Sequence, residues 1–261
     1  MRFRSLAAAA LGFLLVAGTL ISAGTLGVPP AFAAEAKKPL TAAQEEAIKA
    51  LVKKYLIAHP EVIVEAMERL RAEREKRQKE QAKAALVAKR KEIFEDAASP
   101  IGGNEAGDVT IVEFFDYQCG YCKSVVDRLM KTVKKDGKIK MVFKEFPILG
   151  PHSVFAARAA LAAKKQGKYF EFHNAMMRFK GAVNQESVFA IAKSVGIDTK
   201  QLAKDMRDPA IAKALRANFA LARSLRINGT PAFIIGDELV PGAVNQQMLE
   251  SYIEQARKKS G

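Results

Sequence analysis

One strand–helix–strand pattern constrains the fold of this chain more than any other feature. The β-branched and aromatic run over residues 109–115 predicts a buried strand, and residues 138–146 predict another. Between them, the helical spacing of Val125 and Leu129 predicts an α-helix over residues 122–134. A strand, helix and strand of this length form a βαβ unit, so the chain is predicted to contain an α/β domain.

The rest of that domain is predicted to be a helical insertion followed by a hairpin and a helix. Residues 151–227 have a helical pattern throughout, with Pro151 and Pro209 suited to first helical positions. The turn Gly236-Asp237 then separates two short strands. These strands are predicted over residues 232–235 and 238–240, and a closing helix over residues 246–258.

The first 33 residues have the pattern of a secretory signal peptide. Arg2 and Arg4 precede an apolar stretch, and Ala31-Phe32-Ala33 is typical of a cleavage site. An uncleaved anchor is the alternative, but Pro29-Pro30 suits the segment before a cleavage site better than a spanning helix. We therefore expect a mature chain that starts near Ala34 and is exported from the cytosol.

Two further segments, 34–70 and 71–99, are predicted to be helical. Thr41 and Gln44 have the spacing of a capping box at the start of a helix that ends before Pro60. A second helix follows, and if it continued over residues 60–96 it would be about 55 Å long. Its part over residues 71–83 is charged and lacks an apolar face, so it is predicted to be a solvent-exposed linker. The apolar stripes of segment 34–70 need a partner, which is either another copy of the chain or its own catalytic domain.

Charge and cysteine content exclude several functional classes. The chain has 42 Lys and Arg against 28 Asp and Glu, a formal charge of +14, but no block of five like charges. Such dispersed charge is typical of a solvated surface, and no groove-reading motif accompanies it, so we expect no nucleic-acid binding. Two cysteines in the whole chain exclude a disulfide-rich scaffold and a four-thiolate zinc site.

Both cysteines lie in the motif Cys119-Gly120-Tyr121-Cys122, at the junction between the first predicted strand and the helix that follows it. A helix N-terminus stabilises a thiolate, so Cys119 is predicted to be the nucleophile. Cys122, one turn further on, can resolve a mixed disulfide by attacking Cys119. The alternatives are half of a zinc site, a structural disulfide, or inert buried thiols. The three histidines are scattered in sequence and a four-residue loop gains little from a disulfide, so the redox interpretation is preferred.

Two other residues strengthen the redox interpretation. Glu113 lies inside an apolar strand, where a carboxyl is costly to bury unless it has a function. A raised pKa would let Glu113 transfer the proton of Cys122, whereas an edge position facing solvent is the alternative. Pro231 follows Thr230 at the entrance of a later strand, where it is either a simple strand start or a cis proline.

Four segments resemble a known family. Residues 114–122 (FFDYQCGYC), 143–150 (FKEFPILG) and 229–233 (GTPAF) resemble the DsbA-like thiol:disulfide oxidoreductases. Residues 55–65 (YLIAHPEVIVE) resemble the amino-terminal segment of the ScsC (suppressor of copper sensitivity C) branch. The resemblance implies a thioredoxin-like fold with a helical insertion in a catalytic domain over residues 100–261. It also implies oligomers, because amino-terminal extensions in this branch can assemble trimers.

The resemblance also assigns roles to individual residues. Cys119 becomes the attacking cysteine, Cys122 the resolving cysteine, Glu113 the buried acid and Pro231 the cis proline. Substrate would contact Gly120 and Tyr121 in the motif and pair with the backbone at Thr230 and Pro231. No cofactor or metal is expected, and a membrane redox partner would keep the cysteine pair reduced.

One departure from the family pattern bears on the direction of the reaction. The strong oxidase DsbA has a histidine between its cysteines, whereas Gly120 and Tyr121 supply no cation. We therefore expect a higher Cys119 pKa than in that oxidase and a less oxidising disulfide. Gly-Tyr is also the dipeptide of DsbC-type isomerases, which favours isomerisation or reduction.

The first hypothesis is consequently a periplasmic, trimeric thiol:disulfide isomerase or reductase acting on cysteine-containing exported proteins. Three alternatives remain. The chain could be a monomeric DsbA-like oxidase, or a Cu(I)-handling protein that holds the ion between its two thiolates. It could also be a chaperone that uses its helices without redox chemistry.

Overall fold

The structure is a computed structural model that describes residues 39–260, so the predicted signal peptide over residues 1–33 lies outside it. The chain divides into two compact units, and the boundary along the sequence lies between Ile63 and Val64. Within the described residues, no helix combines the length and the apolar character that crossing a membrane requires.

The first unit contains helix α1 (Ala42–Ala58), whose predicted capping box is confirmed. The Gln44 backbone N–H donates to Thr41 Oγ1 at 3.3 Å, and the Thr41 N–H donates to Gln44 Oε1 at 2.9 Å. No residue of α1 is buried, although the helix carries several large apolar side chains. The exposed apolar residues of this unit include Ile48, Leu51, Val52, Tyr55, Ile57 and Ile63.

Helix α2 (Glu61–Ala88) begins in the first unit and continues into the second, where a separate helix α3 (Arg90–Phe94) follows it. The helix that could have continued over residues 60–96 ends at Ala88, and Lys89 interrupts it with φ −106° and ψ 15°. Leu86 before the break and Ile93 after it are both buried in one apolar cluster. Residues 71–81 are exposed as predicted.

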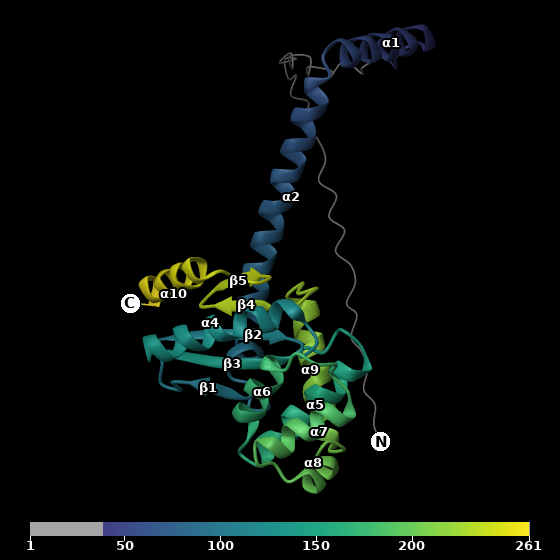
Figure 1. Cartoon of the computed structure of the whole chain (residues 1–261). Coiled ribbons are helices and arrows are strands. Elements are labelled where there is room, and N and C mark those ends of the chain that lie inside the picture. Colours follow the sequence, from purple (N-terminus) through teal and green to yellow (C-terminus); the bar gives the residue numbers. More distant parts are fainter. Residues whose placement is uncertain (1–38, 261) are drawn as a thin grey trace, which may run out of the picture. The chain divides into compact units, whose positions relative to one another are not determined.

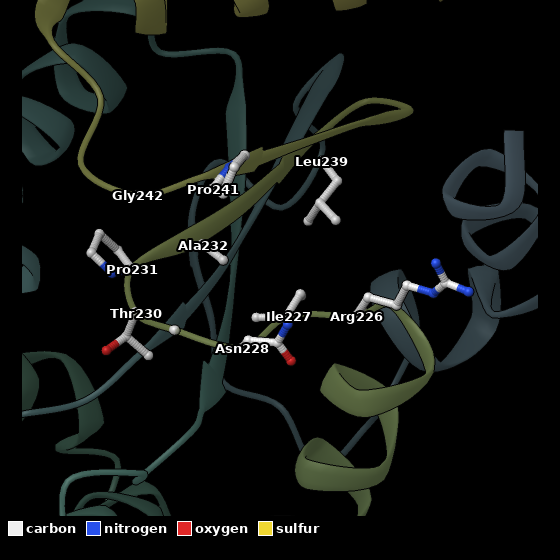
Figure 2. Close-up of a pocket in the computed structure, with 10 residues that line it drawn as sticks. Arg226, Ile227, Asn228, Thr230, Pro231, Ala232, Leu239, Pro241 and Gly242 are labelled. Carbon is white, nitrogen blue, oxygen red and sulfur yellow. The ribbon is translucent and has the colours of Figure 1, made fainter. Parts of the chain in front are cut away.

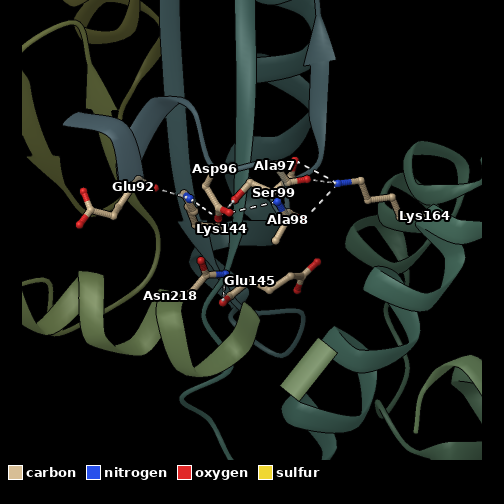
Figure 3. A network of polar contacts seen from close by, with 9 residues as sticks. All are labelled: Glu92, Asp96, Ala97, Ala98, Ser99, Lys144, Glu145, Lys164 and Asn218. Atoms are coloured by element: carbon tan, nitrogen blue, oxygen red, sulfur yellow. Dashed lines mark hydrogen bonds and ion pairs between the residues drawn. The ribbon is translucent and has the colours of Figure 1, made fainter. Parts of the chain in front are cut away.

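The connection from α3 into the sheet is held by two lysines (Figure 3). The Lys144 ammonium, whose side chain is 1% exposed, donates to the Glu92 carbonyl at 2.6 Å and to Asp96 Oδ2 at 2.9 Å. The Lys164 ammonium donates to the carbonyl oxygens of Ala97 and Ala98 at 2.8 and 3.1 Å. These contacts fix the segment that precedes the first strand against the rest of the second unit.

The second unit is built on a five-stranded sheet with the order β1-β3-β2-β4-β5 (Figure 1). The central pair β2 and β3 is parallel, as the βαβ prediction requires, and the other neighbours are antiparallel. The first strand was not predicted, because two of its three residues are glycines and only pairing with β3 defines it. The strands are β1 (Ile101–Gly103), β2 (Val109–Phe115), β3 (Ile139–Glu145), β4 (Ala232–Ile235) and β5 (Glu238–Pro241).

Alternate residues of β2 supply two separate cores. Ile111 and Phe115 lie in a cluster with residues of α4 (Gly120–Asp136) and α10 (Gln246–Ser260), whereas Val112 and Phe114 lie in a second cluster with residues of α3. Successive side chains of a strand point to opposite faces. Glu113 therefore shares the α4 face of the sheet with Ile111 and Phe115.

The predicted helical insertion consists of five helices, which lie together beside the sheet (Figure 1). Pro151 and Pro209 begin helices as predicted, and the Asp208 side chain caps the latter by accepting from the Ala210 N–H at 2.8 Å. The helices are α5 (Pro151–Lys165), α6 (Tyr169–Arg178), α7 (Gln185–Ser194), α8 (Thr199–Asp205) and α9 (Pro209–Ser224).

Candidate active site

The two cysteines occupy the start of α4, on the face of the sheet that also carries Glu113. Cys119 is the N-cap residue, and its backbone N–H donates to the Asp116 carbonyl at 3.0 Å. Both thiols are free, with Cys119 6% exposed and Cys122 fully buried. A client disulfide can therefore approach Cys119, while Cys122 stays behind it for an intramolecular attack.

Local hydrogen bonds stabilise the Cys119 thiolate. The Cys122 thiol is the main cause that lowers the pKa of Cys119, to about 5, and partial burial opposes it. The side chain of Thr230 and the backbone N–H groups of Tyr121 and Cys122 lower the pKa further. These hydrogen bonds stabilise the thiolate without a cation in the motif.

Cys122 and Glu113 are both held in their neutral forms. The hydrogen bond to Cys119, burial and the charge of Glu113 together raise the pKa of Cys122. Glu113 is fully buried in β2, which excludes the solvent-facing alternative. Burial, and secondarily the charge of Cys119, raises the pKa of Glu113 to about 8. At neutral pH, Glu113 is therefore mostly a carboxylic acid that can exchange a proton.

The predicted substrate-contacting residues surround Cys119. The Thr230–Pro231 peptide bond is cis, and the Cys119 thiol donates to the Thr230 carbonyl at 3.2 Å. Gly120 and Tyr121 begin α4, and the Tyr121 side chain is 71% exposed. The structure therefore brings the loop before β4 against the cysteine motif, as the sequence predicted.

A cavity of about 290 Å³ lies behind Thr230 and Pro231. Figure 2 shows the side chains of Ile227, Ala232 and Leu239 between the β4–β5 hairpin and the segment that follows α9. The cavity has an apolar wall and shares Thr230 and Pro231 with the surroundings of Cys119.

Asp116, which sequence reasoning missed, ties the cysteine loop to the start of the helical insertion. Its Oδ1 accepts from the Gln118 N–H at 2.8 Å and from Ser153 Oγ at 2.7 Å. Its Oδ2 accepts from the Leu149 N–H at 2.9 Å. An aspartate at the end of a strand was the only signal in the sequence, and two of its partners, Leu149 and Ser153, lie more than 30 positions away.

Metal-ligating side chains do not gather at this site. Across residues 39–260, no group of three or more His, Cys, Asp and Glu side chains could hold an ion. His173 is instead buried among aromatic rings, and burial lowers its pKa to about 3. The two cysteine sulfurs are thus the soft donors that the structure brings together.

Comparisons with known proteins identify two domains. The DSBA-like thioredoxin domain matches residues 110–254, which is more than half of the chain. The N-terminal domain of the copper resistance protein ScsC matches residues 44–82. The second match covers most of α1 and α2.

Solved structures agree with both matches. A thioredoxin-like oxidoreductase from Silicibacter pomeroyi is 47% identical, with a TM-score of 0.64 over 65% of this chain and 98% of that chain. ScsC of Proteus mirabilis, in a transitional conformation, is 31% identical, with a TM-score of 0.64 over 84% of this chain and 100% of that chain. The thioredoxin-like fold with a helical insertion and a helical extension is confirmed.

A curated relative shares only a segment with this chain. The Na(+)/H(+) antiporter NhaA of Herminiimonas arsenicoxydans is 26% identical over 161 residues, which are 60% of this chain and 25% of the antiporter. The chain thus spans about a quarter of the length of that relative. With the two domain matches, the comparisons show that the chain belongs to the DSBA-like thioredoxin family, in its ScsC-like branch.

Proposed function

We propose that the chain reshuffles or reduces incorrect disulfides in exported proteins of the periplasm. The observation that carries this proposal is the combination of a stabilised Cys119 thiolate with a buried, neutral Cys122 behind it. An isomerase must present a ready thiolate and still release its client. The stabilised thiolate supplies the nucleophile, and the buried thiol behind it supplies the release.

In the first step, the Cys119 thiolate attacks one sulfur of a client disulfide. The client S–S bond breaks, a mixed disulfide forms with Cys119, and the second client sulfur leaves as a thiolate. Isomerisation is completed when another client thiolate attacks the client sulfur of the mixed disulfide. A new client disulfide forms, and Cys119 leaves as a thiolate. No net oxidation of either protein occurs on this route.

The reductive route uses Cys122 and Glu113. Once Cys119 is in the mixed disulfide, its negative charge no longer raises the pKa of Glu113. Glu113 then ionises more readily and takes the proton of Cys122, whose thiolate attacks Cys119 and releases the reduced client. The Cys119–Cys122 disulfide so formed is returned to the dithiol by two electrons from a membrane-bound dithiol reductant.

Client binding is assigned to the surface around Cys119. Tyr121 offers an exposed ring beside the attacking sulfur, and the backbone at Thr230 and Pro231 lies against that sulfur. Gly120 leaves open space where a side chain would stand, which allows a client to approach closely.

We also propose that the chain has four functional parts and acts as a homotrimer. A signal peptide over 1–33 precedes an oligomerisation segment over 34–70, a charged linker over 71–99 and the catalytic domain over 100–261. The exposed apolar side chains of α1 and the match to the ScsC N-terminal domain support this organisation. A trimer would present three cysteine pairs to one client.

Trapping of clients in cells tests the proposal. Cys122→Ala removes the resolving thiol, so disulfide-linked complexes between Cys119 and exported proteins should accumulate and disappear on reduction. Cys119→Ala is the matched control and should trap nothing. Equal trapping by both variants would contradict the roles assigned to the two cysteines.

A monomeric oxidase is the second candidate, because a low Cys119 pKa stabilises the reduced pair and makes its disulfide more oxidising. Alkylation of free thiols in intact cells separates the two functions. A reductase or isomerase is held largely in the dithiol form, whereas an oxidase is held largely as the disulfide.

A further inference from the structure

Four buried polar side chains lie behind the loop that precedes Cys119. They form what we call the Glu145 cluster, and none is more than 5% exposed. Tyr117 Oη and Tyr169 Oη donate to the same carboxyl oxygen, Glu145 Oε1, at 3.1 and 2.9 Å. Tyr117 Oη also contacts His173 Nδ1 at 3.2 Å. The mechanism proposed above uses none of these groups.

Two groups of the cluster meet at the Tyr117 hydroxyl. It lies within hydrogen-bond distance of Glu145 Oε1 on one side and of His173 Nδ1 on the other. Burial lowers the pKa of His173 to about 3, so its ring is neutral. The Tyr117 hydroxyl is therefore held between two buried groups.

The Glu145 carboxyl group is buried and only partly hydrogen-bonded. Burial raises its pKa well above the ordinary value, while the hydrogen bonds from Tyr169 and Tyr117 oppose that shift. Glu145 Oε1 accepts from both tyrosines, and Glu145 Oε2 has no protein hydrogen-bond partner. The carboxyl group therefore acts as a fixed acceptor for the two hydroxyls.

The cluster joins three elements around the cysteine motif. Glu145 ends β3 in register with Phe115, and Asn218 Nδ2 of α9 donates to its backbone carbonyl at 3.0 Å (Figure 3). Tyr169 belongs to α6. Tyr117 lies in the loop, two residues before Cys119. The hydrogen bond from its hydroxyl to Glu145 Oε1 therefore attaches that loop to the end of β3.

We propose that Glu145 is a positioning residue for the redox reaction: by holding Tyr117 it fixes the loop that places Cys119 at the start of α4. The hydrogen bonds that stabilise the thiolate come from Tyr121, Cys122 and Thr230, so they require that placement. The inference rests on the attacking role of Cys119, but not on whether the chain isomerises, reduces or oxidises its clients.

The test compares two tyrosines that donate to the same oxygen. Tyr117→Phe and Tyr169→Phe each remove one hydrogen bond, but Tyr117 alone lies in the cysteine loop. The pKa of Cys119 is measured in the full mature chain from the ultraviolet absorbance of its thiolate, because the Cys122 pKa is raised out of the range scanned. We expect Tyr117→Phe to raise the Cys119 pKa by about one unit, a tenfold loss of thiolate at acid pH, and Tyr169→Phe to leave it nearly unchanged. Equal shifts, or none in either variant, would overturn the proposal.

Two variants of Glu145 complete the test. Glu145→Gln keeps an acceptor oxygen for both tyrosines and should preserve the Cys119 pKa, whereas Glu145→Leu should raise it as Tyr117→Phe does. A wild-type Cys119 pKa in a folded Glu145→Leu chain would overturn the proposal. If Glu145→Leu fails to fold by circular dichroism, the comparison of Tyr117→Phe with Tyr169→Phe decides. The measurement contains no client protein, so its failure is distinct from failure of the proposed function.

Discussion

Replacing Glu113 by glutamine should remove a pH dependence of stability that this residue imposes on the fold. The pKa of Glu113 is raised from 4.5 to about 8, chiefly by burial. Between these values the folded chain keeps a proton that the unfolded chain has released, so this residue makes stability fall as pH rises. The slope approaches about 1.4 kcal/mol per pH unit, and the loss between pH 5 and pH 7 is about 2.5 kcal/mol.

The comparison is made in a Cys119→Ala background. The lowered pKa of Cys119 has the opposite effect on stability over the same range, and its thiolate adds to the shift of Glu113. The Cys119→Ala background removes the titration of Cys119 and the effect of its charge on Glu113. Burial, the larger cause of the raised Glu113 pKa, remains. The free energy of unfolding in urea follows from tyrosine fluorescence, since the chain has five tyrosines and no tryptophan.

The expected result is a stability difference between the two chains that grows with pH. The Cys119→Ala/Glu113→Gln chain should gain up to about 2.5 kcal/mol over the Cys119→Ala chain between pH 5 and pH 7, because burial alone raises the Glu113 pKa in this background. Other titrating groups are common to both chains and cancel. A difference that stays constant over this range would mean that Glu113 is already ionised when folded, and the proton transfer to it from Cys122 would lose its basis.

Three further outcomes follow from the structure. Alkylation of the reduced chain by iodoacetamide should modify Cys119 with a midpoint near pH 5 and spare Cys122 in the folded protein; equal labelling would refute the buried position of Cys122. Asp116→Ala should cost about 3 kcal/mol in the free energy of unfolding, because three short hydrogen bonds to a carboxylate are lost. Leu51→Glu should dissociate the oligomer in light scattering, whereas the control Lys53→Glu should not; an unchanged mass would move the interface away from α1.

Local sequence patterns predicted the elements of the fold that local contacts define. Each of these elements is marked by residues that lie close together in the sequence. The markers are the apolar run of β2, the capping box at Thr41 and the prolines that begin α5 and α9. The break at Lys89 was not predicted, because neither glycine nor proline marks that position. Strand β1 was not predicted, because only pairing with β3 defines it.

The same distinction applies to the site. Cys119, Cys122 and Glu113 could be found because a motif at a strand-to-helix junction and a carboxyl in an apolar strand are visible in the sequence. Tyr117 and Glu145 could not, since their contact joins positions 28 residues apart. Before the fold is known, such residues look like ordinary polar or aromatic positions.

Isomerase activity of the Cys119 thiolate is tested most directly by the recovery of active ribonuclease from its scrambled-disulfide form in a glutathione buffer. The chain from Ala34 onward, without the proposed signal peptide, is the catalyst, and Cys119→Ala is the control. We predict recovery well above the buffer rate with the wild-type chain and recovery at the buffer rate with the variant. Wild-type recovery no faster than the buffer would contradict isomerisation, and equal acceleration by the variant would contradict the role of the Cys119 thiolate.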